Sequence, residues 1–271
     1  MKTRILSGAV IIILLVAFLC LGGWFLYGGM LLVSLIGMYE MYKVRNMQRS
    51  SLAILGYLSA ITYYILIEFK PITMDMFFLI ASFIAIMTAY VITFPKYNSD
   101  DAIWAFMTVI YVAVFLSYIY QLREAENGIY LVWLIFIASW GNDTCAYFAG
   151  VALGKHKMTP KLSPKKTWEG FIGGIVGVAL IGTAFGYVIK DILLEYFAHP
   201  IWTCVIACVI GALLSVVGDL TASAIKRNHN IKDYGNLIPG HGGIIDRFDS
   251  VIFTAPVVYW ATVFMNTLFT K

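Results

Sequence analysis

Long apolar runs dominate this sequence, and they restrict its fold more than any other feature. A helix needs about 20 apolar residues to cross a hydrocarbon core of roughly 30 Å, and lipid offers no partners for unpaired backbone groups. The alternating pattern of a transmembrane barrel strand is absent. The sequence therefore predicts an all-α, polytopic integral membrane protein with about nine transmembrane helices. The runs cover residues 5–22, 23–42, 52–69, 76–94, 102–122, 129–154, 171–189, 201–220 and 251–269.

The composition excludes an ordinary soluble domain. Hydrophobic residues make up 61% of the chain and charged residues only 13%, whereas soluble domains carry about 25% charged residues. The formal net charge of +4 therefore reports mainly on membrane topology, and we expect no nucleic-acid partner.

The charged loops predict the orientation of the chain. With the N-terminus in the cytoplasm, most of the 19 lysines and arginines lie in cytoplasmic segments. The exceptions on the other side are Lys70, Arg123, Lys190 and Lys271. Since positive residues favour the cytoplasmic side, we expect a cytoplasmic N-terminus. The first run follows Lys2 and Arg4, as in a signal peptide, but no small-residue cleavage site follows it, so we expect an uncleaved anchor.

Polar residues are concentrated in the second half of the chain. We therefore expect residues 1–125 to form an N-terminal scaffold of transmembrane helices. Residues 126–271 are expected to form a C-terminal transmembrane region that carries the chemistry at a cytoplasmic-facing site. Three segments of that region are rich in polar and charged residues: GNDTCAYFAG at 141–150, KHKMTPKLSPKKTWEG at 155–170, and GDLTASAIKRNHNIKDYGNLIPGHGGIIDRFDS at 218–250.

Asp143 is an acid in the middle of a predicted membrane helix. It precedes Lys155 by 12 residues, which places it about 18 Å from the cytoplasmic end of that helix. A carboxylate at this depth costs several kcal/mol unless it faces a wet cavity or a cation. Asp143 is therefore a functional candidate, and the alternative is a buried acid that bonds to a neighbouring helix.

The segment SPKKTWEG reads as the start of a helix. Ser163 is a favourable N-cap and Pro164 is favoured at the first helical position. Lys165 and Lys166 would then lie in a first turn that already carries partial positive charge, which is unfavourable unless an anion binds there. The alternative is that these lysines only extend to the membrane interface.

The third segment combines acids, bases and glycines. Asp219, Ser223 and Lys226 are spaced at i, i+4 and i+7, on one face of a continuing helix, with Arg227 adjacent. A break follows at residues 232–235. Gly240, Gly242 and Gly243 then allow the backbone to approach a ligand and to point amide groups at it, as in phosphate-binding nests.

Two further acids follow the glycines. Asp246 and Asp249, at i and i+3 in the first turn of the last predicted helix, suit a hard divalent cation. Acidic pairs need cations and basic clusters need anions, so their combination at helix ends predicts a site for metal-bound polyphosphate.

These motifs resemble the signature of the phosphatidate cytidylyltransferases, also called CDP-diacylglycerol synthases. The resemblance lies in Ser223-x-Ile-Lys226-Arg227, in Lys232-Asp233, and in Pro239-x-His241-Gly242-Gly243-Ile244-x-Asp246-Arg247-Phe248-Asp249. The stretches at 163–170 and 143–150 resemble further motifs of the family. The resemblance covers the C-terminal half, while the N-terminal helices match only in number and character.

The resemblance implies a multi-pass enzyme of the inner (cytoplasmic) membrane that serves phospholipid biosynthesis. Such an enzyme is expected to be a homodimer that converts CTP and phosphatidate to CDP-diacylglycerol and diphosphate, using Mg²⁺ alone or with a second cation. The expected metal ligands are Asp219, Asp246 and Asp249, and these act in catalysis with Lys226 and Arg247. The expected substrate-binding residues are Asp143, Lys165, Lys166, Ser223, Arg227, Lys232, His241, Gly242 and Gly243.

Two other functions remain as alternatives. A CTP-dependent lipid (polyprenol) kinase would use similar groups but transfer the γ-phosphoryl group, and the full HGG-x-x-DRFD signature argues against it. A transporter should show polar residues in both halves, whereas the first five predicted helices are nearly bare. For His241 we expect hydrogen bonding or a role in loop geometry, with proton transfer as the alternative.

Overall fold

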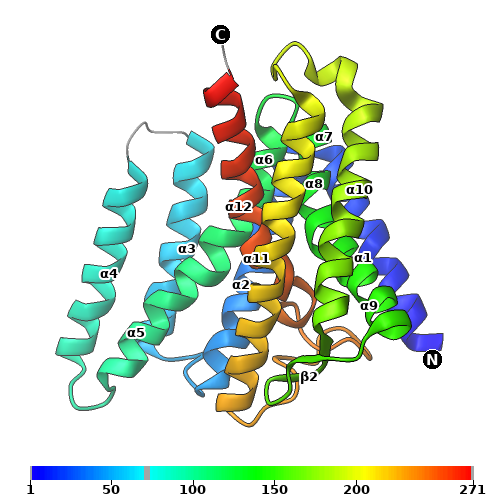
Figure 1. Cartoon of the computed structure of the whole chain (residues 1–271). Coiled ribbons are helices and arrows are strands. Elements are labelled where there is room, and N and C mark those ends of the chain that lie inside the picture. Colours follow the sequence, from blue (N-terminus) through cyan, green and yellow to red (C-terminus); the bar gives the residue numbers. More distant parts are fainter. Residues whose placement is uncertain (1, 70–73, 270–271) are drawn as a thin grey trace. The chain divides into compact units, whose positions relative to one another are not determined.

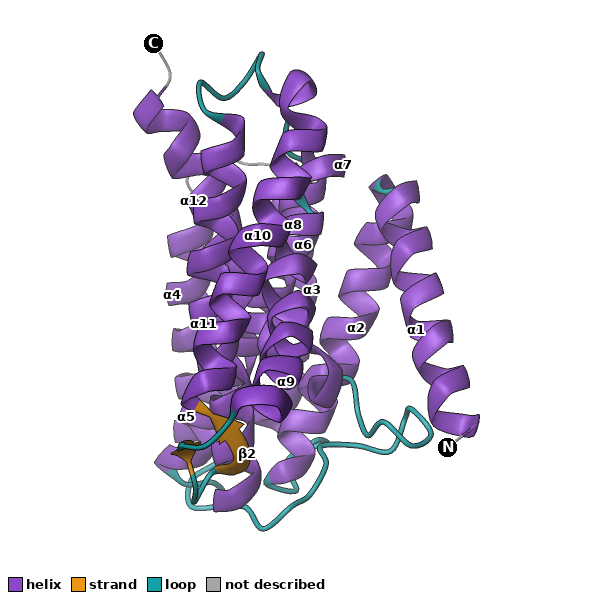
Figure 2. Ribbon diagram, turned by 45° about the vertical axis from the view of Figure 1, so that its right-hand side comes forward, coloured by secondary structure: helices purple, strands orange, loops and turns teal. Residues whose placement is uncertain are grey.

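All of the predicted apolar runs are helical in the computed structural model, which describes residues 2–69 and 74–269, with side chains for 7–69 and 76–268. The first helices are α1 Lys2–Leu21, α2 Gly23–Val44, α3 Ser51–Phe69 and α4 Met74–Ile92. The last are α10 Trp168–Leu193, α11 Pro200–Asn228 and α12 Ile245–Phe269. The only strands in the described part of the chain are β1 Lys157–Thr159 and β2 Ser163–Thr167, which form a hairpin (Figure 2).

The fifth and sixth runs are each assembled from several helical segments. The fifth comprises α5 Ser99–Thr108, the π-helical η1 Val109–Val114 and α6 Phe115–Glu124. The sixth comprises α7 Gly128–Leu131, α8 Trp133–Phe136, the π-helical η2 Ile137–Gly141 and α9 Asn142–Leu153. A π turn changes the direction of the side chains that follow it and is frequent at functional sites. The η2 turn ends at Gly141, two residues before Asp143.

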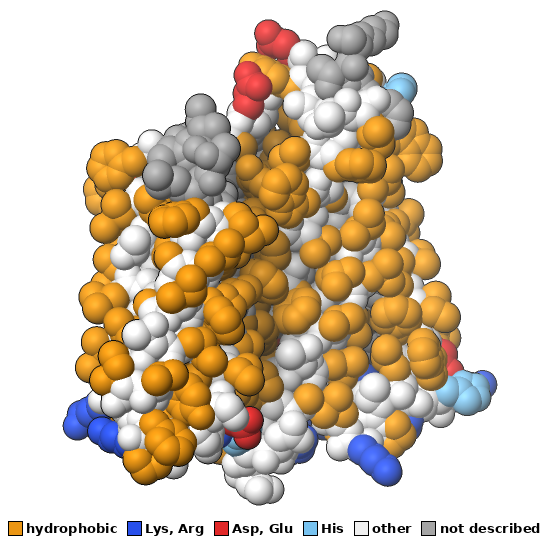
Figure 3. Space-filling model, turned by 90° about the vertical axis from the view of Figure 1, so that its left-hand side faces the viewer, with side chains coloured by type: hydrophobic (Ala, Val, Ile, Leu, Met, Phe, Trp, Pro, Cys, Tyr) orange, Lys and Arg blue, Asp and Glu red, His pale blue; other side chains and the backbone are white. Residues whose placement is uncertain are grey.

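The fold class predicted from the sequence is confirmed. Seven helices in the described residues are long and apolar enough to cross a membrane, and shorter apolar helices cover Ser7–Leu21 and Met76–Ile92. Large hydrophobic side chains such as Ile92 and Val188, each 77% exposed, are the kind that lipid covers. Figure 3 shows hydrophobic side chains gathered along the helices on one face, with lysines and arginines near helix ends. The count of nine spans and the orientation stay predictions.

The chain divides into two compact units. The first contains residues 1–120 and 229–247, and the second contains residues 121–228 and 248–271. The glycine-rich segment of the third polar region thus belongs with the N-terminal helices. The predicted division of labour around residue 125 stays a prediction.

Glycines and other small residues let the helices of the second unit approach closely. α10 lies beside both α9 and α11 (Figure 1), and it buries Gly170, Gly174, Gly182 and Gly186. An added Cβ on Gly173 would lie 2.2 Å from the Cβ of Ala149 on α9. Close packing of this kind stabilises helix pairs in lipid, where hydrophobic burial offers little driving force between helices.

This packing predicts a clear difference between two glycine substitutions. We expect Gly173→Ala to destabilise the detergent-solubilised protein by about 1–3 kcal/mol, because the methyl group overpacks the interface. Gly28→Ala is the matched control, since nothing lies within 4 Å of its added Cβ and alanine is the better helix former. Thermal unfolding followed by tryptophan fluorescence measures both, and equal midpoints would contradict the packing argument.

Candidate functional site

The hairpin before α10 replaces the helix start that the sequence predicts at Ser163, and that prediction is wrong. β1 and β2 pair in antiparallel register, with Lys157 opposite Thr167. The Thr167 hydroxyl accepts a hydrogen bond from the Gly170 amide at 3.1 Å and caps α10, which begins at Trp168. The capping side chain thus comes four residues later than Ser163, because residues 163–167 find strand partners in β1. Lys165 and Lys166 lie in a strand, so they do not face the positive end of a helix dipole in the way that the sequence predicts.

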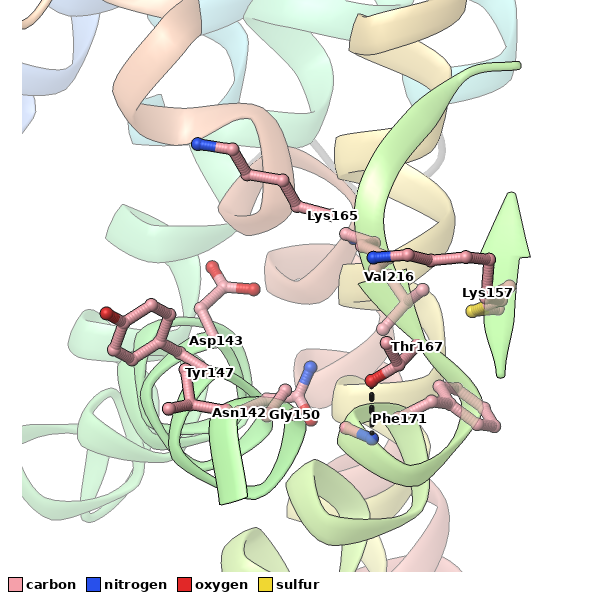
Figure 4. A pocket seen from close by; sticks show the side chains of 14 residues that line it. Asn142, Asp143, Tyr147, Gly150, Lys157, Lys165, Thr167, Phe171 and Val216 are labelled. Atoms are coloured by element: carbon pink, nitrogen blue, oxygen red, sulfur yellow. Dashed lines mark hydrogen bonds between the residues drawn. The ribbon is translucent and has the colours of Figure 1, made fainter. Parts of the chain in front are cut away.

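A cavity of about 380 Å³ lies in the second unit, where α9, the hairpin, α10 and α11 meet. Figure 4 shows the carboxylate of Asp143 on the side of this cavity where Lys165 lies. Apolar side chains line much of the remaining wall, together with Asn142 and Thr167. The lining residues are Asn142, Asp143, Ala146, Tyr147, Gly150, Val151, Lys157, Met158, Lys165, Lys166, Thr167, Gly170, Phe171 and Val216. Asp143 thus shares a cavity wall with lysines, and its functional role stays a prediction.

Acids and lysines alternate in the second unit around this cavity. The Lys166 ammonium lies 2.6 Å from the Asp219 carboxylate, and Asp143 interacts electrostatically with both. Asp249 interacts in the same way with Asp219 and Asp143, and with Lys226 of α11. Three acids predicted from separate segments of the sequence therefore lie within electrostatic reach of one another and of two lysines.

Hydroxyl groups support these acids. Ser250 donates from its hydroxyl to Asp143 at 3.4 Å and from its amide to Asp249 at 2.8 Å. Ser223 donates to Asp219 at 3.4 Å, as the shared helix face predicts. Ser250 was not among the residues predicted from the sequence, although its place directly after the acidic signature is a signal that could have identified it.

The continuing helix predicted after residue 220 is confirmed, because α11 extends to Asn228. Asp219, Ser223 and Lys226 therefore share one helix, and Arg227 is exposed next to its end. The start of the last helix among the signature residues is also confirmed, since α12 begins at Ile245.

The glycine-rich loop of the first unit lines a second cavity of about 600 Å³. Its walls include Lys232, His241 and Arg247. The loop is closed by hydrogen bonds from the Ile238 amide to the Gly242 carbonyl and from the His241 amide to the Ile238 carbonyl, each 2.9 Å long. The φ angle of Gly242 is 83°, a conformation that a glycine adopts without strain.

Two side chains on this loop have informative surroundings. The Nε of Arg247 is buried and finds no hydrogen-bond acceptor among the described residues, so a bound anion would satisfy it. The Nδ1 of His241 lies 2.8 Å from the hydroxyl of Ser7 on α1, and that hydroxyl donates to the Pro239 carbonyl. Ser7 was not predicted from the sequence, because it is 234 residues away from His241.

Asp246 organises the loop of the first unit. Its side chain is largely buried and accepts hydrogen bonds from the Tyr234 amide at 2.8 Å and the Gly243 amide at 3.0 Å. Oδ2 accepts both bonds, and Oδ1 takes part in neither of them. The role of Asp246 as a metal ligand stays a prediction.

The donor chemistry of the second unit fits Mg²⁺. Asp143, Asp219 and Asp249 offer the hard oxygen atoms that this cation prefers. No group of three His, Cys, Asp or Glu side chains among the described residues is arranged to hold a metal ion by itself. Proteins usually bind Mg²⁺ through one or two carboxylates together with substrate phosphates, so this arrangement suits an ion that is shared with a polyphosphate.

Comparison with known proteins agrees with the sequence motifs. Residues 2–265 match the cytidylyltransferase family. A phosphatidate cytidylyltransferase of Staphylococcus haemolyticus is 30% identical over 263 residues, which cover 95% of this chain and 97% of that protein. Proteins of the same name from Staphylococcus saprophyticus and Staphylococcus aureus are 31% and 30% identical, with the same coverage of both chains. The chain therefore belongs to the cytidylyltransferase family.

Proposed function

We propose that this protein is a nucleotidyltransferase that converts CTP and phosphatidate to CDP-diacylglycerol and diphosphate. The observation that carries the proposal is the cavity of the second unit, where lysines of the hairpin meet acids of membrane-spanning helices beside apolar walls. A lipid phosphate needs such a combination of cationic and apolar groups. The name shared by the relatives supports the same reaction.

The chemistry follows from charge. An oxygen of the phosphatidate phosphate attacks the α-phosphorus of CTP, and the bond between that phosphorus and the oxygen that bridges to the β-phosphate breaks, so that diphosphate leaves. Lys165, Lys166 and Lys226 would hold phosphate oxygens and lower the repulsion between two anionic substrates. Bound Mg²⁺, held by Asp219 and Asp249 with Asp246 as the third predicted ligand, would supply further neutralisation of phosphate charge.

The loop of the first unit supplies a second set of phosphate-binding groups in this proposal. Arg247 offers a buried Nε without a protein acceptor among the described residues, and Lys232 and His241 line the same cavity. Gly242 and Gly243 allow a close approach of the backbone to phosphate oxygens. Arg247 suits this role, because a guanidinium can hold a phosphate through two parallel hydrogen bonds.

We propose further that the protein lies in the inner (cytoplasmic) membrane with its site towards the cytoplasm. The distribution of lysines and arginines supports this orientation, and CTP would then arrive from the cytosol. A homodimer is proposed on the resemblance alone, and light scattering of the detergent-purified protein would test it.

The position of a radioactive label in the products tests the reaction. With purified protein, phosphatidate and Mg²⁺, we expect α-labelled CTP to place its label in a chloroform-extractable lipid, while γ-label leaves in diphosphate. A lipid kinase would give the reverse pattern. Label from the γ position in the lipid would contradict the proposed function and favour the polyprenol kinase.

Lys166 offers a sharper test of the cavity. We expect Lys166→Gln to lower kcat/KM at least about 10-fold, because the cation that joins Asp219 and the substrate phosphates is lost. Lys165→Gln, in the same cavity wall, is expected to raise the KM for a phosphate-bearing substrate. Lys161→Gln is the matched control, since that lysine is exposed in the turn of the same hairpin. If kcat/KM and KM were the same in all three variants, Lys165 and Lys166 would contribute to membrane topology and not to substrate binding.

A further inference from the structure

We propose that Glu40 is a positioning residue for the reaction, because it fixes from α2 the backbone of the loop that carries His241, Gly242 and Arg247. This inference rests on the proposed function. Glu40 lies in the first unit together with that loop. No motif of the sequence points to it, and it acts through the loop and not by contact with substrate.

The contacts of Glu40 are directed at the start of α12. Its Oε1 accepts a hydrogen bond from the Ile244 amide and its Oε2 accepts one from the Ile245 amide, each at 3.0 Å. The first amide groups of a helix have no partner within the helix, and a carboxylate is the favoured group at this positive end. Glu40 therefore caps α12 from another helix, 205 residues away in the sequence from Ile245.

Glycines make room for this carboxylate. A Cβ on Gly243 would lie 2.3 Å from Oε1 and 2.4 Å from Oε2 of Glu40, and a Cβ on Gly235 would lie 2.4 Å from Oε1. Any larger residue would push the acid away from the amides that it binds. The requirement for glycine at positions 235 and 243 thus arises from the fit to Glu40, in addition to any approach of a ligand.

Glu40 and Asp246 together hold both sides of the loop. Asp246 accepts from the amides of Tyr234 and Gly243, and Glu40 accepts from the next two amides, of Ile244 and Ile245. Three consecutive amides are thereby fixed by two acids. Gly242, which comes just before these residues, and Arg247, which comes two residues after them, line the cavity of the first unit, so the geometry of that wall depends on the two carboxylates.

Glu40 is buried, so its carboxylate depends on protein groups for stabilisation. The residue is 4% exposed and lies in a candidate membrane-spanning helix. A buried acid in such a helix costs several kcal/mol unless its partners compensate for lost water. Because its two hydrogen bonds go to the loop, the compensation is available only when the loop has this conformation.

The test compares Glu40→Gln with Glu68→Gln. A glutamine keeps the size of the side chain but offers one acceptor and one donor, so that one of the two amides loses its partner. We expect Glu40→Gln to lower kcat/KM roughly 10- to 100-fold, with a raised KM for CTP or phosphatidate. Glu68→Gln is the control, because Glu68 accepts from the Tyr120 hydroxyl in the same unit and no cavity-lining loop depends on it in the proposal.

The split between KM and kcat separates positioning from mere stability. A structural defect lowers the fraction of active enzyme and therefore the apparent kcat, while both KM values remain as in the wild type. Active-site titration or a thermal unfolding scan corrects for that fraction. Unchanged KM values in Glu40→Gln, or an equal change in Glu68→Gln, would overturn the proposal. An inactive wild-type protein would instead contradict the proposed function.

A double-mutant cycle that combines Gly243→Ala with Glu40→Ala tests the positioning role independently. The alanine methyl group would collide with the Glu40 carboxylate, so Gly243→Ala alone should be strongly impaired. In Glu40→Ala the obstacle is gone, and the second change should then cost much less than in the wild-type background. Additive effects on kcat/KM would show that Gly243 and Glu40 act separately and would overturn the positioning role.

Discussion

Asp249→Asn should lower turnover by more than about 100-fold while the protein stays folded in detergent. Asp249 interacts with two other acids, Asp219 and Asp143, and with Lys226. Three acids so close together repel one another, and they are stable side by side when cations are shared among them. Replacing one carboxylate by an amide removes a hard ligand for Mg²⁺ but leaves an oxygen that can accept from the Ser250 amide.

The measurement is the initial rate at saturating CTP, phosphatidate and Mg²⁺, together with a thermal unfolding scan. Asp191→Asn is the control, because Asp191 is an exposed acid of the same unit. A second readout is the Mg²⁺ concentration for half-maximal rate, which should rise in the variant if any rate remains. Retention of more than about a tenth of the wild-type rate at saturating Mg²⁺ would contradict the metal assignment, since one lost ligand should cost several kcal/mol.

Asp246→Asn provides a useful contrast. One oxygen of its carboxylate accepts hydrogen bonds from two backbone amides. The side-chain NH₂ of an asparagine at this position could face those backbone N–H groups, and both sides would then be donors. We expect this variant to lose both activity and thermal stability. A loss of activity at an unchanged unfolding midpoint would favour a metal role for Asp246 over a role in the loop.

The transmembrane helices could be predicted from the sequence because their cause is local. A run of about 20 apolar residues has few alternatives to a helix in lipid, and α2 and α3 follow the predicted runs closely. Asp143 was identified for the same reason, since an acid within an apolar run is costly wherever the run lies. The spacing of Asp219, Ser223 and Lys226 was informative because a single helix relates them.

The features that were missed depend on contacts between distant segments. A local rule for helix caps favours Ser163, yet strand pairing with β1 moves the start of α10 to Trp168. The ion pair of Lys166 with Asp219 joins a strand to a helix that follows much later in the chain. Glu40 and Ser7 contact the glycine-rich loop across more than 200 residues, and no spacing rule relates positions so far apart. A lone acid in the second apolar run was nevertheless the same kind of signal that identified Asp143.

The rate should fall at acid pH in a way that belongs to the substrate and not to His241. A phosphate monoester has a second pKa near 6, so phosphatidate is mostly a dianion at pH 7 and becomes a weaker, monoanionic nucleophile below it. A dianion needs charge neutralisation but no positioned base, whereas a lipid hydroxyl of high pKa needs one. We therefore expect kcat/KM for phosphatidate to fall with an apparent pKa of about 6–7, as this ionisation predicts.

His241→Gln decides between the two origins of this pH dependence. The Nδ1 of His241 lies 2.8 Å from the Ser7 hydroxyl, and the same hydroxyl donates a hydrogen bond to the Pro239 carbonyl. The imidazole therefore helps to fix the conformation of the loop. Its replacement should lower kcat/KM at every pH by a similar factor and leave the acid limb in place. Ser7→Ala, which removes the partner but keeps the imidazole, should produce the same parallel shift. If the acid limb disappeared in His241→Gln and persisted in Ser7→Ala, the imidazole would be the titrating group. The reaction would then use a general base, and the neutralising lysines and Arg247 would no longer suffice to explain it.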